Sequence, residues 1–158
     1  MLASTDLAIL ADSPTIEQID GLDVRNRELE AQGYGVTLKH TDHFAPGTYV
    51  RDLFIPAGTE LAGARHKTDH VVIFDGDITV WHEGSMVRLT GRHVLTSKAG
   101  SKRVGYTHAD TWCTGVFPNP DNETDVRVLE ARFVENSEQL QCNRMPVLPR
   151  REETPCLV

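Results

Sequence analysis

Between Val36 and Phe117 the chain is divided into short segments rich in β-branched and aromatic residues, with turn signals after about every ten residues. The segments expected to form strands are 49–55, 69–74, 78–81, 85–89, 93–97, 103–107 and 111–117. The turns expected between them are 56–58, 75–77, 82–84, 90–92, 98–100 and 108–110. Short strands without intervening helices predict an antiparallel sheet that closes or folds on itself, as in a sandwich or barrel.

Helices are expected on both sides of this β region. Ser13 followed by Pro14 and an early acidic residue predicts a helix start, with Ser13 as the cap, and the helix is expected to end before Gly33. Near the C-terminus, Asp125 and the apolar spacing over 126–134 favour a second helix, although the same residues partly alternate like a strand. We therefore divide the chain into a helical segment, a barrel, a C-terminal helix and an extended or disordered proline-rich tail: 1–38, 39–118, 119–141 and 142–158.

Composition narrows the class of protein. The chain has 158 residues, of which 39% are hydrophobic and 25% charged, the balance of one ordinary soluble domain. Its apolar runs are far shorter than the roughly 18 residues of a membrane span, and the first residues carry no targeting signal, so we expect a cytoplasmic protein. A net charge of -7 disfavours nucleic-acid partners. The three cysteines fit neither a disulfide framework nor a metal knuckle, and Cys113 is expected to act as a small hydrophobic residue.

Segment 63–76, GARHKTDHVVIFDG, resembles the first motif of the cupin superfamily, in which a histidine cluster precedes an acidic residue, six further residues and a glycine. Asp69 and Gly76 match the last two. The surrounding segments 44–51, 97–103 and 106–112 resemble small cupin-like proteins common in tailed-bacteriophage genomes. The resemblance covers roughly residues 40–135. It implies a mainly β, single-domain, cupin-like jelly-roll barrel with a short N-terminal helix and a C-terminal helix.

The family implies a fold more firmly than a reaction. The resemblance implies a barrel that binds a small polar or anionic molecule, with a divalent transition metal (Fe, Mn, Ni or Zn), as an oxygenase, isomerase or lyase. A second hypothesis is a non-catalytic phage-encoded module that sequesters a host metabolite or protein, and a third is a structural or assembly role. Many cupins pair through sheet edges, so a homodimer is expected. A phage-encoded protein would work in the host cytoplasm.

Four residues are candidate metal ligands: His66, His70, His108 and Asp69. Because neighbours in a strand face opposite sides of a sheet, Asp69 and His70 cannot both point into the barrel. The cupin register would turn Asp69 inward, and a shifted site would turn His70 inward. The chain also departs from the second cupin motif, with Lys98 at the usual proline and Arg103 at the usual metal-binding histidine.

Without a metal, the same region can bind an anion. Lys102 and Arg103 are candidate ligand-binding residues, with Arg103 able to hold a carboxylate or phosphate through two parallel hydrogen bonds. Tyr106 and His108 are the candidate catalytic residues, able to donate or remove a proton. The alternative is that the two cations are solvated residues at a strand edge.

Two further interpretations concern individual side chains. Trp81 and Trp112 are expected to serve packing rather than ligand binding. Asp42 or Asp110 is expected to orient a nearby imidazole.

Overall fold

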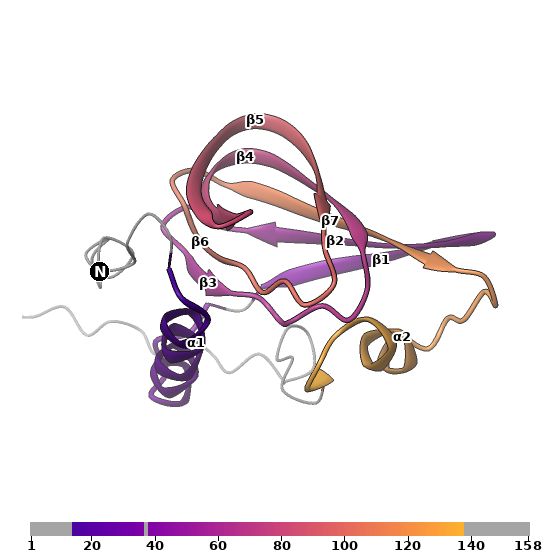
Figure 1. The fold of residues 1–158 in the computed structure, drawn as a ribbon, viewed down its shortest axis with the longest axis horizontal. Helices are drawn as coiled ribbons and strands as arrows, with labels where there is room; N and C mark the ends of the chain where they lie inside the picture. Colours follow the sequence, from indigo (N-terminus) through magenta and orange to yellow (C-terminus); the bar gives the residue numbers. More distant parts are fainter. Residues whose placement is uncertain (1–13, 37, 138–158) are drawn as a thin grey trace, which may run out of the picture.

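The computed structural model describes residues 14–36 and 38–137 and contains one antiparallel sheet and two helices (Figure 1). The elements are α1 (Ile16–Ala31), β1 (Lys39–Ala45), β2 (Gly47–Ile55), β3 (Glu60–Ala62), β4 (His70–His82), β5 (Ser85–Ser97), β6 (Val104–Thr107), β7 (Thr111–Asn119) and α2 (Val126–Phe133). The predicted fold class is confirmed: a mainly β domain with one helix before the sheet and one after it. The predicted tail, 142–158, lies outside the described residues. No described helix has the length and apolar character needed to cross a bilayer.

The sheet curls because its central strand changes partners halfway along. The strand order is β1-β2-β7-β4-β6-β3, and β5 pairs with β4 along the other side. The first half of β4 pairs with β7, and its second half pairs with β6. Gly76 lies at the change with φ 151°, facing Gly91 of β5. A Cβ atom there would lie 2.4 Å from Thr111 Oγ1, so only glycine fits this bend.

This bend corrects the sequence prediction of turns at 75–77 and 90–92. Both segments lie inside continuous strands, β4 and β5, which bend together as one long hairpin (Figure 1). The turn predicted at 82–84 is confirmed, because Glu83 and Gly84 both have positive φ and connect β4 to β5 in a two-residue hairpin loop. Strands β1 and β3 were not predicted.

Helix α1 starts at Thr15 rather than at the expected Ser13, which lies outside the described residues. Thr15 and Gln18 form a capping box, in which each side chain accepts a hydrogen bond from the backbone N–H of the other residue. The helix ends before Gly33, as expected, where φ is 89°. Its Ile19 and Leu22 pack on Val104 of β6. The helix therefore lies against the side of the sheet formed by β3, β6 and the end of β4.

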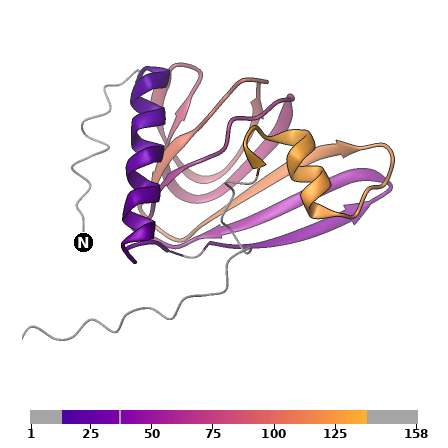
Figure 2. The same ribbon diagram turned by 90° about the horizontal axis from the view of Figure 1, so that it is seen from below.

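Helix α2 forms as predicted, capped by Asp125, whose side chain accepts a hydrogen bond from the Arg127 backbone N–H. Leu129 and Phe133 pack on Tyr49 of β2 and Phe117 of β7. Beyond the helix, Val134 makes an isolated antiparallel bridge with His66. Helix α2 and the residues after it thus cover one end of the curled sheet (Figure 2).

A second apolar core fills the rest of the curl. Its buried members come from β4 and β5: Val72, Phe74, Ile78, Val80 and Leu89. The even-numbered residues of β4 therefore face inward on both sides of the bend.

Candidate functional site

Two histidines lie together inside the curl. His66 belongs to the segment before β4, and His70 is the first residue of β4, where the alternation that buries Val72 and Phe74 also buries its ring. The two ring centroids are 4.0 Å apart, and Phe117 stacks on both, at 4.8 Å from His70 and 5.9 Å from His66. Of the two alternatives left open by the sequence, the structure therefore has His70 inward and Asp69 outward.

Both imidazoles are neutral at neutral pH. Burial, together with repulsion from His70, Arg103 and Arg51, lowers the pKa of His66 to about 3. Burial also lowers the pKa of His70, whose Nδ1 lies 3.3 Å from the carbonyl oxygen of Thr68 and donates to it as an N–H. His66 Nδ1 is buried and has no hydrogen-bond partner within the part of the chain that the structure describes.

Arg103 lies near these histidines, in the segment between β5 and β6. Its Nη1 donates a hydrogen bond of 3.0 Å to Oγ of the buried Ser97. Burial lowers the pKa of the guanidinium from its usual value. Among the described residues, no carboxylate forms an ion pair with Arg103. The thiol of Cys113 lies nearby, and desolvation raises its pKa to about 12, so it is not a nucleophile at neutral pH.

A second polar cluster, which the sequence analysis did not predict as a unit, lies on β1, β2 and α2. Arg51 Nη2 donates to the buried Glu130 at 2.7 Å, and its Nε contacts Asp42 and the Tyr49 hydroxyl. The charge of Arg51 is therefore compensated, unlike that of Arg103. Asp42 Oδ2 also lies 3.1 Å from His40 Nε2, which is the orienting contact to an imidazole expected of Asp42. The inward position of Arg51 on the alternating strand β2 was the one sequence signal for this cluster.

Two of the other predicted site residues form ion pairs away from the histidines, Asp69 at the surface and Lys102 half-buried under α1. Asp69 is exposed and accepts hydrogen bonds from the Ala99 backbone N–H at 2.8 Å and from Lys98 Nζ at 2.9 Å, which lower the pKa of Asp69 and hold the turn after β5. Lys102 Nζ lies 2.9 Å from Asp20 and 2.8 Å from Asp23, so Lys102 attaches α1 to the sheet.

Tyr106 and His108 lie on the outer side of the sheet. Tyr106 is opposite Thr79 in the β4–β6 ladder, whereas the neighbouring Ile78 and Val80 face the core. The rings of Tyr106 and His108 meet edge to face at 5.1 Å, and His108 Nε2 is 2.8 Å from Thr79 Oγ1. The structure thus brings together three of the seven predicted residues, His66, His70 and Arg103, and does not bring Asp69, Lys102, Tyr106 or His108 to them.

The residues of this site do not fit a four-ligand metal centre. No group of three or more His, Cys, Asp or Glu side chains suited to a metal ion occurs within residues 14–36 and 38–137. The two imidazole rings lie 4.0 Å apart, tilted by 33° to each other, and a guanidinium lies close enough to lower the pKa of both. A fixed positive charge at that position opposes a second cation.

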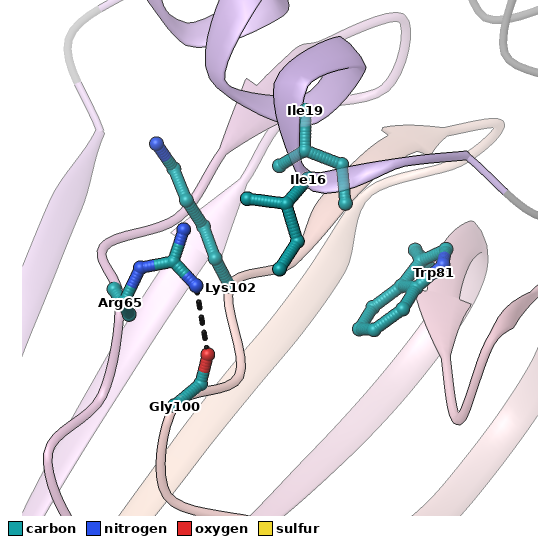
Figure 3. A pocket seen from close by; sticks show the side chains of 6 residues that line it. All are labelled: Ile16, Ile19, Arg65, Trp81, Gly100 and Lys102. Atoms are coloured by element: carbon teal, nitrogen blue, oxygen red, sulfur yellow. Dashed lines mark hydrogen bonds between the residues drawn. The ribbon is translucent and has the colours of Figure 1, made fainter.

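A small hollow between α1 and the sheet is a different feature (Figure 3). It is lined by Ile16, Ile19, Arg65, Trp81, Gly100 and Lys102. Its volume is about 40 Å³, enough for a few water molecules at most. Arg65 Nη1 bridges it by donating to the Gly100 carbonyl at 2.9 Å. It is too small for a metabolite.

Comparisons with known proteins give partial structural likenesses. No family model and no curated protein sequence matches the chain. A solved structure of a cupin superfamily protein from Desulfitobacterium hafniense matches with a TM-score of 0.45 and 10% identity, over 52% of this chain and 77% of that one. Ectoine synthase from P. lautus matches with a TM-score of 0.44 and 18% identity, over 53% and 64%. A mutant of salicylate 1,2-dioxygenase from Pseudoaminobacter salicylatoxidans matches with a TM-score of 0.48 and 16% identity, over 80% and 41%. Neither a family nor a ligand for this chain follows from matches at these scores.

Proposed function

We propose that this protein has a cupin-type barrel that binds a small oxyanion, a carboxylate or a phosphate, inside its curled sheet, with Arg103 as the main contact. The observation that carries the proposal is the position of Arg103, inside the curl, bonded to Ser97 and without a carboxylate among the described residues.

Desolvation explains why this position points to a ligand. Arg103 is half-buried, and a charge taken partly out of water without a counterion raises the free energy of the folded protein, by an amount on the order of several kcal/mol for full burial. The chain has 23 acidic residues, and Arg51, on the same inner face, is paired with two of them. Arg103 pairs with no acidic residue within 14–36 and 38–137, and it donates one N–H group to Ser97. An oxyanion that enters the site would supply the missing charge and accept the remaining N–H groups in a bidentate arrangement.

The neutral histidines support the same ligand class. Because both imidazoles stay uncharged at neutral pH, they add hydrogen-bonding nitrogen atoms without a second charge. His66 Nδ1, buried and without a described partner, is free to contact the ligand. The predicted proton-transfer residues, Tyr106 and His108, lie on the other side of the sheet. We therefore propose binding and no particular reaction.

The proposal is tested by titrating the full chain with inorganic phosphate and, separately, with malonate, while recording amide chemical shifts. We expect one of the two to bind with a dissociation constant of about 1 mM or tighter, and Arg103→Gln to weaken binding by at least about tenfold. Lys102→Gln is the matched control, because it removes the neighbouring charge in the sequence, which faces α1 instead. No binding of either anion, or equal binding by Arg103→Gln, would refute the proposal.

A ligand that stays bound through purification would identify the chemical class of ligand directly. Native mass spectrometry of protein purified without an affinity tag should show an added mass that Arg103→Gln loses. If the wild-type mass is that of the chain alone and neither anion binds, the results favour the structural or assembly hypothesis over the hypothesis of a binding module.

Metal analysis of the same preparation addresses the metal hypothesis. Because only two of the four candidate ligands lie together, and Arg103 lies beside them, we expect less than one metal ion per chain. One metal ion per chain that is lost in His66→Ala would contradict this expectation and support the hypothesis of a metal enzyme.

A further inference from the structure

A hydrogen bond to the backbone fixes which ring nitrogen of His70 carries the proton. Nδ1 lies 3.3 Å from the carbonyl oxygen of Thr68. Because a carbonyl oxygen only accepts hydrogen bonds, the proton of the neutral ring is on Nδ1, and Nε2 keeps a lone pair. His70 is 6% exposed, and its Nε2 has no hydrogen-bond partner within residues 14–36 and 38–137. The site therefore contains a hydrogen-bond acceptor without a donor.

Packing holds the His70 ring in this orientation. The ring stacks on Phe117 at 4.8 Å, and the ring of His66 lies 4.0 Å away. Gly115 leaves the space that the Phe117 ring occupies, because a Cβ atom at Gly115 would lie 2.7 Å from Cε2 of that ring. A half-turn of the His70 ring about its Cβ–Cγ bond would break the hydrogen bond to Thr68 and set a C–H group against the carbonyl oxygen. Nε2 therefore stays the acceptor of the ring.

Arg103 supplies hydrogen-bond donors beside this acceptor. Ser97 is directly opposite His70 in the β4–β5 ladder, and its Oγ accepts the hydrogen bond of 3.0 Å from Arg103 Nη1. Residues opposite each other in an antiparallel ladder have their Cα atoms about 4.5 to 5.5 Å apart. Ser101 Oγ lies 2.7 Å from Ser97 Oγ and holds that hydroxyl from a second side. The structure thus places a guanidinium and a nitrogen lone pair close together on the inner face of the curl.

We propose that the oxyanion of this site carries its own O–H donor, as a hydrogen phosphate or a 2-hydroxy carboxylate does. The inference rests on the proposed function and makes His70 the residue that sets its specificity. The charged oxygens of the ligand accept from Arg103, and its O–H group donates to His70 Nε2. An oxyanion without this hydrogen sets an oxygen lone pair against the lone pair of Nε2. A site built to bond a hydroxyl rejects the analogue that lacks it.

Two pairs of anions test this specificity on the full chain. Phosphate at neutral pH keeps at least one O–H group, whereas sulfate has the same shape and none. Glycolate differs from acetate by one hydroxyl. We expect phosphate to bind at least about tenfold more tightly than sulfate, or glycolate than acetate, although charge alone favours sulfate. The pair that shows the difference identifies the source of the O–H group, and equal affinities within both pairs would overturn the inference.

The variant His70→Phe tests the residue itself. It keeps an aromatic ring beside Phe117 and removes the acceptor, so the preference within the discriminating pair should fall to about twofold or less. His43→Phe is the matched control, because His43 is exposed on β1, and it should keep the preference of the wild type. A preference that His70→Phe retains in full would refute the role of His70.

Arg103→Gln distinguishes a failure of this inference from a failure of the proposed function. It should weaken both members of each pair, because both use the charge of the guanidinium. If the wild type binds the members of each pair equally and Arg103→Gln weakens both, the proposed function stands and the inference on the O–H donor is wrong. If none of the four anions binds, or Arg103→Gln changes no affinity, both proposals are wrong.

Nitrogen NMR of the wild-type His70 ring gives a readout that needs no variant. In ¹⁵N-labelled protein, Nδ1 should have the chemical shift of a protonated ring nitrogen, and Nε2 that of an unprotonated one. A saturating concentration of the preferred anion should move the Nε2 resonance toward the protonated value, because Nε2 then accepts a hydrogen bond, and should leave Nδ1 unchanged. A proton on Nε2 in the free protein would overturn the inference.

Discussion

Arg103 is proposed to bind the ligand, but its unpaired charge lowers the stability of the protein without a ligand. In the absence of a ligand its desolvated charge is a cost, so Arg103→Met should leave the free energy of unfolding unchanged or raise it by about 1 to 2 kcal/mol. Urea denaturation in a buffer without oxyanions measures this difference. The comparison variant Lys102→Met loses two ion pairs to α1 and should lower the free energy by about 1 kcal/mol. A loss of more than about 1 kcal/mol in Arg103→Met would mean that the arginine is a structural residue.

His66 links stability to pH. Its pKa is about 3 in the folded protein against 6.5 for the ordinary side chain, so between these values the unfolded chain binds more protons. The stabilisation is fully present above pH 6.5 and is lost as the pH falls toward 3. His66→Phe, which keeps an aromatic ring beside Phe117, removes this dependence. The difference in unfolding free energy between wild type and variant should shift by about 1 kcal/mol per pH unit from about pH 6 to 4. Parallel curves for the two proteins would show that His66 is not buried as a neutral ring.

The sequence identified residue types better than it identified their directions. His66, His70 and Arg103 were recognised from the motif, and they do lie close together. Alternation alone established that Asp69 and His70 face opposite sides, but it could not say which faces inward. That choice depends on the ladder pairing of β4 with β7, which places His70 with Val72 and Phe74. Lys102 precedes Arg103 in the chain, yet it faces α1, whose position over the sheet is a tertiary property.

Among the secondary-structure elements, the bent β4–β5 hairpin has the largest effect on the shape of the site. Gly76→Ala combines a positive φ with a contact of 2.6 Å to the Asp110 carbonyl oxygen, whereas Gly91→Ala has a positive φ of 79° and open space around the new atom. We expect Gly76→Ala to lower the free energy of unfolding by about 3 kcal/mol or more and Gly91→Ala by about 1 kcal/mol. Thermal unfolding of the two variants separates the steric clash from backbone strain. Equal losses would show that β4 relaxes at the bend without cost.

Element prediction succeeded where local chemistry decides and failed where pairing decides. The end of α1 and the start of α2 depend on capping residues and glycine, which the sequence shows directly. The segment 75–77 has the composition of a turn, but pairing on both sides of β4 keeps it in the sheet, with a glycine bend in place of a reversal. Strand β1 was missed because its residues, KHTDHFA, lack the β-branched pattern, and its pairing with β2 supplies what propensity does not.

The overall charge of the molecule opposes the ligand class that the site favours. A protein with net charge -7 repels anions at long range, and that repulsion is screened over about 10 Å at 0.1 M salt. The contact between Arg103 and a bound oxyanion lies inside the curl, where salt screens it little. The two effects therefore respond differently to ionic strength, and the balance between them distinguishes an interior site from a basic surface patch.

For an interior site, we predict that the affinity for phosphate stays constant or increases as the salt concentration increases. From about 20 to 150 mM sodium chloride, we expect the dissociation constant for phosphate to stay within about twofold or to fall. A site made of exposed cations such as Lys98 would lose affinity over the same range, because salt weakens its attraction to the anion. Titrations at the two salt concentrations, with Lys98→Gln as the control variant, measure the trend. A loss of more than about fivefold in the wild type, reduced in Lys98→Gln, would move the binding site from the interior to the surface.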